Sequence, residues 1–210
     1  KNFSIARDEA YLIPVVKQIY TYCPDLFVYS AVWSVPGWMK DSGNMCGGSL
    51  LDEYMPAFAN YWAAYLDAYR KAGIEIDAFS DHDYGGWERV MEVLADKNVR
   101  KNISAVAWHP YAGKPSMMKN ITKEYPGTVM HLTERGPNLV MTDVQDPKWF
   151  ADVIFGALNN GCSSYSSWNL VLDPDGQPCT GRYACAGLET VDLETGKVTK
   201  SHQYTVFHQF

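Results

Sequence analysis

The chain has 210 residues, of which 47% are hydrophobic and 20% charged, and its formal net charge is −6. This composition is typical of a folded protein with a sizeable core. The negative charge and the absence of a Lys/Arg block argue against a nucleic-acid partner. No apolar run reaches the roughly 18 residues of a membrane span, and no signal peptide is visible after the opening Lys1-Asn2-Phe3.

The first part of the chain predicts strands that alternate with helices. Residues 26–32 form a compact apolar run typical of a buried parallel strand, and a long loop follows it. Residues 49–71 read as a helix, because apolar and aromatic side chains recur with a period near 3.6. Residues 74–79 resemble a second strand, followed at once by the polar triplet Asp81-His82-Asp83.

The second part continues the same alternation. We expect further helices at residues 87–95, 115–125 and 147–159, and further strands at residues 103–108, 128–133 and 162–168. Residues 188–210 suggest a β-meander or hairpin, with a turn at residues 194–197.

Strands that alternate with helices imply the α/β class, with a parallel sheet and right-handed crossovers. At most five strand–helix units are present, whereas a complete (β/α)₈ barrel takes about 250 residues. An open doubly wound sheet is the alternative. Against it, Gly47-Gly48 and Gly85-Gly86 lack the spacing of a phosphate-binding loop.

Polar and aromatic side chains stand at the ends of the predicted strands, which is where α/β barrels keep their chemistry. For a sugar substrate, Glu134 would act on the anomeric carbon, and aromatic faces and hydrogen-bonding groups would hold the ring. The candidate substrate-binding residues are Trp33, Asp81, His109, Tyr111, Trp168 and Asn169.

Each candidate also has a structural interpretation. Glu134 alone would be an ordinary loop carboxylate, and Trp168 an ordinary core residue. His109 would be a structural histidine before a proline, and residues 81–83 a solvated turn or a helix cap. A metal site at Asp81, His82, Asp83 and His109 lacks the helical spacing of zinc sites, so we predict neither a metal nor another cofactor.

The five cysteines and three sequons bear on the compartment. Cys179 and Cys185 flank a short polar loop that a disulfide would close, and the odd count leaves at least one further thiol. Asn2, Asn102 and Asn120 each begin an Asn-x-Ser/Thr triplet. These triplets favour a secreted or lysosome-like compartment.

Five segments, in order along nearly the whole chain, resemble glycoside hydrolase family 30, which includes glucosylceramidases and β-1,6-glucanases. The segment from Trp33 to Lys40, followed by Gly47-Gly48-Ser49-Leu50, resembles the family's WSxPxWMK…GGSL signature. The other matching segments are Phe3-Ser4-Ile5-Ala6-Arg7-Asp8, Ala107-Trp108-His109-Pro110-Tyr111, Thr133-Glu134 and Trp168-Asn169-Leu170-Val171-Leu172-Asp173.

The resemblance implies retaining hydrolysis of a β-glucoside such as glucosylceramide or a β-glucan, with Glu134 as the nucleophile and no cofactor. It also implies that residues 1–187 form an incomplete (β/α)₈ barrel, and that residues 188–210 begin a C-terminal β-sandwich.

The departures from the family pattern concern the catalytic acid and the barrel. The family's first two strands are absent, as is the Asn-Glu-Pro motif that carries the acid/base at the end of its fourth strand. Residues 74–79 resemble that fourth strand and residues 80–84 the end of the fifth, as though the two were fused. The resemblance then places Asp81 and Asp83 at the end of the fifth strand, one strand beyond the position of the family's acid/base. We therefore expect them not to replace the missing acid.

We therefore expect an impaired enzyme. The alternative is a non-catalytic glycan-binding remnant or an incomplete gene product. An incomplete barrel exposes strand edges, so we also expect the isolated chain to be poorly soluble.

Overall fold

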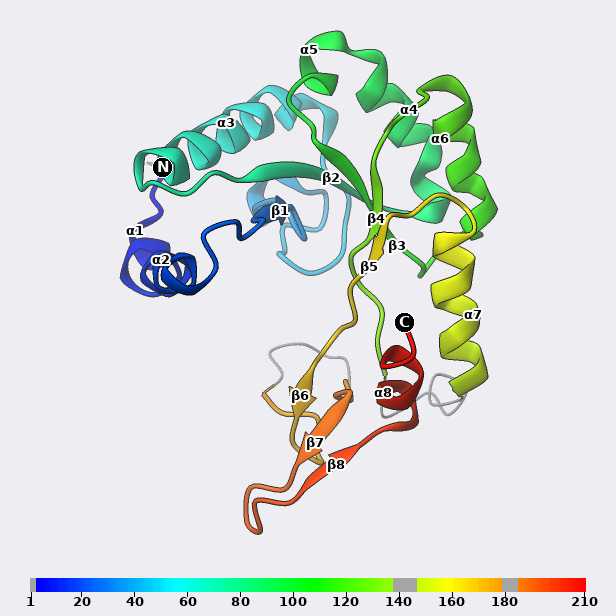
Figure 1. The fold of residues 1–210 in the computed structure, drawn as a ribbon. Helices are drawn as coiled ribbons and strands as arrows, with labels where there is room; N and C mark the ends of the chain where they lie inside the picture. Colours follow the sequence, from blue (N-terminus) through cyan, green and yellow to red (C-terminus); the bar gives the residue numbers. More distant parts are fainter. Residues whose placement is uncertain (1–2, 138–146, 179–184) are drawn as a thin grey trace. The chain divides into compact units, whose positions relative to one another are not determined.

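A computed structural model describes residues 3–137, 147–178 and 185–210 (Figure 1). Its contacts divide the chain into two compact units, Lys1–Ser80 and Asp81–Phe210. Five parallel strands, β1 to β5, follow one another through the main sheet in chain order. Within the described residues, no helix is both long and apolar enough to cross a membrane.

The first unit is mainly helical. Its helices are α1 (Ala6–Ala10), α2 (Leu12–Tyr22) and α3 (Met55–Lys71), with 3-10 turns η1 (Gly37–Met39) and η2 (Asp52–Tyr54). Strand β1 (Tyr29–Ala31) pairs in parallel with the start of β2 (Asp77–Asp83). Ile13, Tyr69 and Ile74 form its small buried core. The expected strand and helix are present but shorter, whereas α1 and α2 have no counterpart in the sequence-based prediction.

The second unit carries the regular strand–helix alternation. After the end of β2 come η3 (Tyr84–Gly86), α4 (Trp87–Ala95), α5 (Lys97–Arg100), β3 (Ala105–His109), η4 (Pro115–Met118), α6 (Lys119–Glu124), β4 (Met130–Leu132), α7 (Pro147–Leu158) and β5 (Ser164–Tyr165). Strand β4 pairs in parallel with both β3 and β5. Helix α4 begins and ends where the sequence predicts it.

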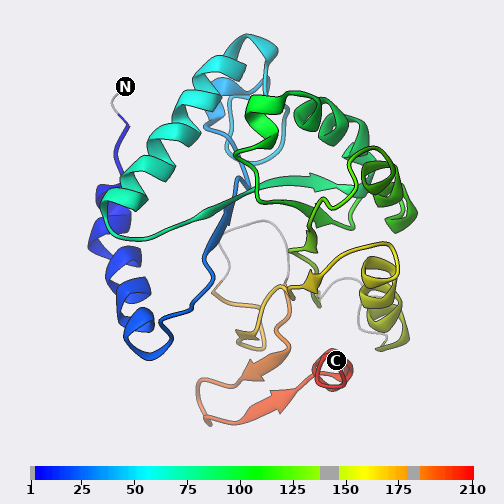
Figure 2. The ribbon, with the colours of Figure 1, turned by 45° about the horizontal axis from the view of Figure 1, so that its top comes forward.

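Helices α4, α6 and α7 lie on one side of β3, β4 and β5 (Figures 1 and 2). They pack against fully buried side chains of the strands, among them Val106, Trp108, Met130 and Leu132. Because strand side chains alternate between faces, His109 and His131 point to the other face of the sheet. One-sided helix cover is typical of a (β/α)₈ barrel segment, whereas a doubly wound sheet carries helices on both faces.

Two predicted boundaries are wrong near the strand ends. Residues 81–83 are not a solvated turn, because β2 continues without a break through Asp83, and they do not cap the helix that begins at Trp87, because Gly86 stands at its N-cap. Strand β5 contains only Ser164 and Tyr165, so Trp168 lies in the loop beyond it. Both differences lie at polar strand ends, where the hydrophobic pattern does not show at which residue a strand ends.

A small separate sheet follows β5. It contains β6 (Val171–Leu172), β7 (Glu189–Val191) and β8 (Val198–Lys200), with β6 parallel and β8 antiparallel to β7. The predicted hairpin is thus confirmed. A further helix, α8 (His202–Phe207), was not predicted; the Ser201 hydroxyl caps it by accepting a hydrogen bond from the Tyr204 amide.

Candidate active site

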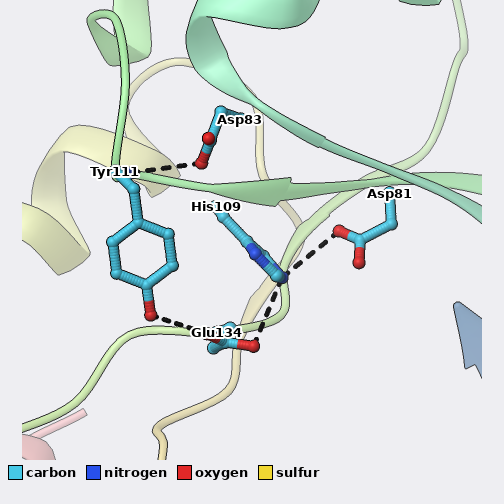
Figure 3. A network of polar contacts seen from close by, with 5 residues as sticks. All are labelled: Asp81, Asp83, His109, Tyr111 and Glu134. Carbon is cyan, nitrogen blue, oxygen red and sulfur yellow. Dashed lines mark hydrogen bonds and ion pairs between the residues drawn. The ribbon is translucent and has the colours of Figure 1, made fainter. Parts of the chain in front are cut away.

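Four of the predicted site residues form one polar network in the second unit (Figure 3). Asp81 belongs to β2 and His109 to β3, Tyr111 follows β3, and Glu134 follows β4. Parallel pairing places the carboxyl ends of these neighbouring strands along one edge of the sheet. The sheet topology therefore brings residues up to 53 positions apart in sequence to one place.

Glu134 lies at the centre of this network. Its Oε1 accepts a 2.6 Å hydrogen bond from the Tyr111 hydroxyl, and its Oε2 lies 3.8 Å from His109 Nε2. The side chain is only 13% exposed. A short hydrogen bond to a carboxylate is among the stronger protein hydrogen bonds, so the Glu134 carboxylate is held in one orientation.

Asp81 approaches the same imidazole from another strand. Its Oδ1 lies 3.2 Å from His109 Nε2, and its side chain is 11% exposed. Burial raises the pKa of Asp81 to about 6; the nearby charges of Glu134 and Asp83 also raise it, while His109 lowers it. Two carboxyl groups therefore face one imidazole, and one of them holds its proton into the mildly acidic range.

Asp83 and Tyr111 support the network. Asp83 points to the same face as Asp81, because residues two apart on a strand share a face, and its Oδ1 accepts a 3.3 Å hydrogen bond from the Tyr111 amide. Burial, followed by the hydrogen bond to Glu134, raises the pKa of the Tyr111 hydroxyl, so this group stays a proton donor. If residues 77–83 are treated as one strand, whose side chains alternate between the two faces, the sequence predicts Asp83 on the same face as Asp81.

Arg135 lies next to Glu134 in a clamp of two aromatic rings that the sequence did not indicate. Its guanidinium carbon lies 4.9 Å from the centre of the Tyr111 ring and 4.8 Å from that of Trp149 on α7. Its carbonyl oxygen accepts hydrogen bonds from the Tyr165 hydroxyl at 2.5 Å and the Trp168 amide at 3.4 Å. The residue that follows the candidate nucleophile is therefore held both by its side chain and by its carbonyl group.

The loop after β5 lies directly against this segment. The Trp168 backbone contacts Gly136, and the Asn169 carbonyl accepts a 3.0 Å hydrogen bond from the Leu188 amide. Trp168 is 47% exposed, so it is not the core residue of the alternative interpretation. Its ring remains a candidate sugar platform, and the role of the Asn169 side chain stays a prediction.

Trp33 belongs to the first unit, just beyond β1, and is 60% exposed. The loop that follows it is held by Lys40, whose ammonium donates to the carbonyls of Met45 and Gly47 at 2.9 Å each. A substrate-binding role for Trp33 stays a prediction.

The remaining predicted positions are only partly described. Asn2 and Cys179 lie outside the described residues, so the Cys179–Cys185 pairing stays untested. Asn102 is exposed in a turn after α5, and Asn120 is half-buried on α6. Within the described ranges, no group of three or more His, Cys, Asp or Glu side chains is arranged to hold a metal ion.

Comparison with known proteins bears on this geometry. Residues 1–86 match the TIM-barrel domain of glycosyl hydrolase family 30. The resemblance to this family is confirmed. The whole chain is 26% identical to the Neurospora crassa endo-1,6-beta-D-glucanase over 266 positions, covering 54% of that protein. With the mouse lysosomal acid glucosylceramidase, the identity is 22% over 247 positions, covering 84% of this chain and 48% of that protein.

A solved structure supports the fold. SrfJ from Salmonella typhimurium superposes with a TM-score of 0.74 at 21% identity, over 99% of this chain and 58% of that one. The fold class is therefore α/β with part of a (β/α)₈ barrel and a small separate sheet, as predicted. The chain spans about half the length of these family relatives.

Proposed function

We propose that this chain carries part of the catalytic domain of a retaining β-glycoside hydrolase, with Glu134 as the nucleophile. The hydrogen bond from Tyr111 to Glu134 is the observation that supports it most directly. It holds a mostly buried carboxylate in one orientation at the end of a barrel strand, as a nucleophile in a family 30 enzyme requires. The similarity to a β-glucanase and a glucosylceramidase suggests a β-glucoside as substrate.

In this reaction a Glu134 oxygen attacks the anomeric carbon while the bond to the leaving oxygen breaks. A covalent glycosyl-enzyme forms, and water later releases the sugar with retained configuration. Tyr111 keeps the carboxylate from rotating, and Trp168 offers an exposed ring beside the same loop. The predicted roles of Asp81, His109 and Asn169 are to bind sugar hydroxyls.

The leaving oxygen also needs a proton, and the chain contains no Asn-Glu-Pro motif to supply it. The alignment with the Neurospora protein runs over 266 positions although this chain has only 210 residues, so that relative carries residues this chain lacks. Loss of a general acid/base typically costs about 10²–10⁴-fold in rate. We therefore propose an enzyme impaired on substrates whose leaving group must be protonated.

Covalent trapping tests the nucleophile without needing the acid. A 2-deoxy-2-fluoro-β-glucoside with a dinitrophenolate leaving group should add one fluoroglucosyl group to the peptide that contains Glu134, as detected by mass spectrometry. The Glu134→Gln variant should take no label. The Glu92→Gln variant, which changes an exposed carboxylate on α4, should label like the unmodified chain.

A non-catalytic glycan-binding remnant is the second candidate. The exposed rings of Trp33 and Trp168 favour it, because exposed tryptophans provide stacking faces without any chemistry. Saturable binding of a β-1,6-glucan, with no covalent label and no change in Glu134→Gln, would support this candidate instead.

We also propose a secreted or lysosome-like compartment, on the basis of the sequons. Of the two sequons that the structure describes, the exposed Asn102 is better placed than Asn120 to accept a glycan. Expression in a eukaryotic host should therefore give a product whose mass falls on treatment with an N-glycosidase, and Asn102→Gln should remove much of that difference.

A further inference from the structure

We propose that Asp81 donates the proton to the leaving group in this chain and so partly replaces the glutamate of the absent Asn-Glu-Pro motif, in an enzyme that stays impaired relative to one with that glutamate. This inference rests on the proposed function, because a proton donor has meaning only where glycoside cleavage occurs. It differs from the expectation drawn from the family pattern, which places Asp81 one strand beyond the usual acid. The geometry around His109 is the reason for the change.

Asp81 and Glu134 lie close enough to each other to act on one substrate. Asp81 Oδ1 and Glu134 Oε2 lie 3.2 Å and 3.8 Å from the same atom, His109 Nε2, so the two oxygens are at most 7.0 Å apart, the sum of both distances. Retaining glycosidases hold their carboxyl groups about 5–5.5 Å apart, and inverting enzymes about 6.5–9.5 Å. A sugar that reaches Glu134 is therefore within range of Asp81.

The surroundings of Asp81 favour its protonated form. Its side chain is 11% exposed, and its buried Oδ1 has no hydrogen-bond partner of acceptable geometry among the described residues. A buried anionic oxygen without a donor is costly, whereas a neutral carboxyl avoids that cost and gains a proton to donate. The pKa of about 6 for Asp81, raised mainly by burial, agrees with this conclusion from the geometry.

The other acidic and basic groups of the network are less suited to this role. Asp83 already accepts a hydrogen bond from the Tyr111 amide, so it acts as an acceptor. His109 lies between the two carboxyl groups, with its Nε2 at 3.2 Å from Asp81 Oδ1 and 3.8 Å from Glu134 Oε2 (Figure 3). It is better placed to keep the two carboxyl groups apart than to reach a leaving oxygen.

Asp81 takes part in both steps of the proposed reaction. In the first, a Glu134 oxygen bonds to the anomeric carbon, the bond from that carbon to the leaving oxygen breaks, and the Asp81 proton passes to the leaving oxygen. In the second, the Asp81 carboxylate takes a proton from water, the water oxygen bonds to the anomeric carbon, and the bond to Glu134 breaks.

Two substrates with different leaving groups test the proposal. Phenolate leaves poorly without a proton, whereas dinitrophenolate needs none. Asp81→Asn should lower kcat/KM for phenyl β-glucoside by about 100-fold or more, and that for dinitrophenyl β-glucoside by less than about tenfold. Added azide should restore turnover of the dinitrophenyl substrate and yield β-glucosyl azide. Asp152→Asn, at an exposed position on α7, is the matched control and should change neither value.

The unmodified chain provides a measurement that needs no variant. With the phenyl substrate, kcat/KM should fall as pH rises through about 6, because Asp81 then loses its proton. With the dinitrophenyl substrate, this fall in kcat/KM should be absent. The charged groups that face Asp81, namely His109, Glu134 and Asp83, are the same in both experiments.

The outcomes separate this inference from the proposed function. If the fluoroglucoside fails to label Glu134 in the unmodified chain, the proposed function is wrong and this inference falls with it. If Glu134 is labelled but Asp81→Asn slows both substrates equally, or yields no glucosyl azide, only the role of Asp81 is wrong. The leaving-group pattern in His109→Gln instead of Asp81→Asn would likewise overturn it.

Discussion

A Cβ atom on Gly136 would lie 1.4 Å from the carbonyl oxygen of Trp168. No side chain fits in this space, so Gly136 is the position at which the loops after β4 and β5 come into backbone contact. This contact places Trp168 beside the segment that carries Glu134.

Gly136→Ala should therefore destabilise the second unit strongly. We expect the free energy of unfolding to fall by at least about 3 kcal/mol, because backbone and not a flexible side chain must move. Urea denaturation followed by tryptophan fluorescence measures this loss. Gly85→Ala is the control: its Cβ would meet Ala112 at 3.5 Å, an ordinary contact, and the change should stay within about 1 kcal/mol.

Tyr111→Phe should slow catalysis. The variant removes only the hydroxyl that donates to Glu134, and a hydrogen bond to a charged group contributes about 1.5–3 kcal/mol, or roughly 10- to 100-fold in kcat/KM. The dinitrophenyl β-glucoside assay provides the measurement. Tyr22→Phe, at a side chain that is 83% exposed, should behave like the unmodified chain. Equal rates for both variants would contradict a role for the Tyr111 hydroxyl.

Arg135→Lys should weaken the clamp formed by Tyr111 and Trp149. A lysine keeps the charge but loses the planar group that stacks between two rings, so we expect a loss of about 1 kcal/mol in the free energy of unfolding. Arg89→Lys, which alters an exposed ion pair with Glu92, should cost less than about 0.5 kcal/mol. Equal losses in the free energy of unfolding for Arg135→Lys and Arg89→Lys, measured by thermal and urea denaturation, would show that the clamp contributes nothing to stability.

Asp81 and His82 should give opposite pH dependences of stability. Burial raises the folded-state pKa of Asp81 to about 6, so its contribution is complete below pH 4 and is lost as pH rises through 6, up to about 3 kcal/mol. Burial, and then the charges of Arg89 and His109, lower the pKa of His82 to about 4. Its contribution is present above pH 6.5 and is lost as pH falls through 4.

Variants separate these two contributions. Between pH 4 and 6.5, the stability of Asp81→Asn should rise with pH more steeply than that of the unmodified chain, because the contribution of Asp81, which falls as pH rises, is removed. His82→Gln should show the reverse difference. Urea denaturation at half-unit pH steps measures both slopes, and identical slopes in all three proteins would show that neither group titrates abnormally.

The elements that could be predicted from the sequence are those with a strong hydrophobic period. Helix α4 agrees at both ends, β4 lies within its predicted run, and β3 extends one residue beyond its own, to His109, because the apolar residues of these elements build the core of the second unit. Residues 81–83 were misread because strand ends that face a site are polar, which resembles a turn. Helices α1 and α8 were missed because they span only five and six residues, too few for a clear period, and α8 also depends on the Ser201 cap. Helix α2 was missed although its apolar residues follow a helical pattern.

The candidate site also contains residues that the sequence could indicate and contacts that it could not. Glu134, His109, Tyr111 and Asp81 could be selected because each stands at or beyond the end of a strand, and sheet topology then brings strand ends together. The Arg135 clamp and the contact between Gly136 and Trp168 could not be selected. They depend on where α7 and the β5 loop lie, and neither position follows from local sequence.

The burial of strand β3 affects amide hydrogen exchange and local opening in this chain. Its first four residues are fully or almost fully buried, and only His109, the last, approaches solvent. Amide hydrogens in such a strand exchange with solvent mainly through global unfolding. The imidazole between the two carboxyl groups is thus anchored to the slowest-exchanging part of the chain. Local opening of the loops around it would leave His109 in place, so the polar network would form again when those loops close.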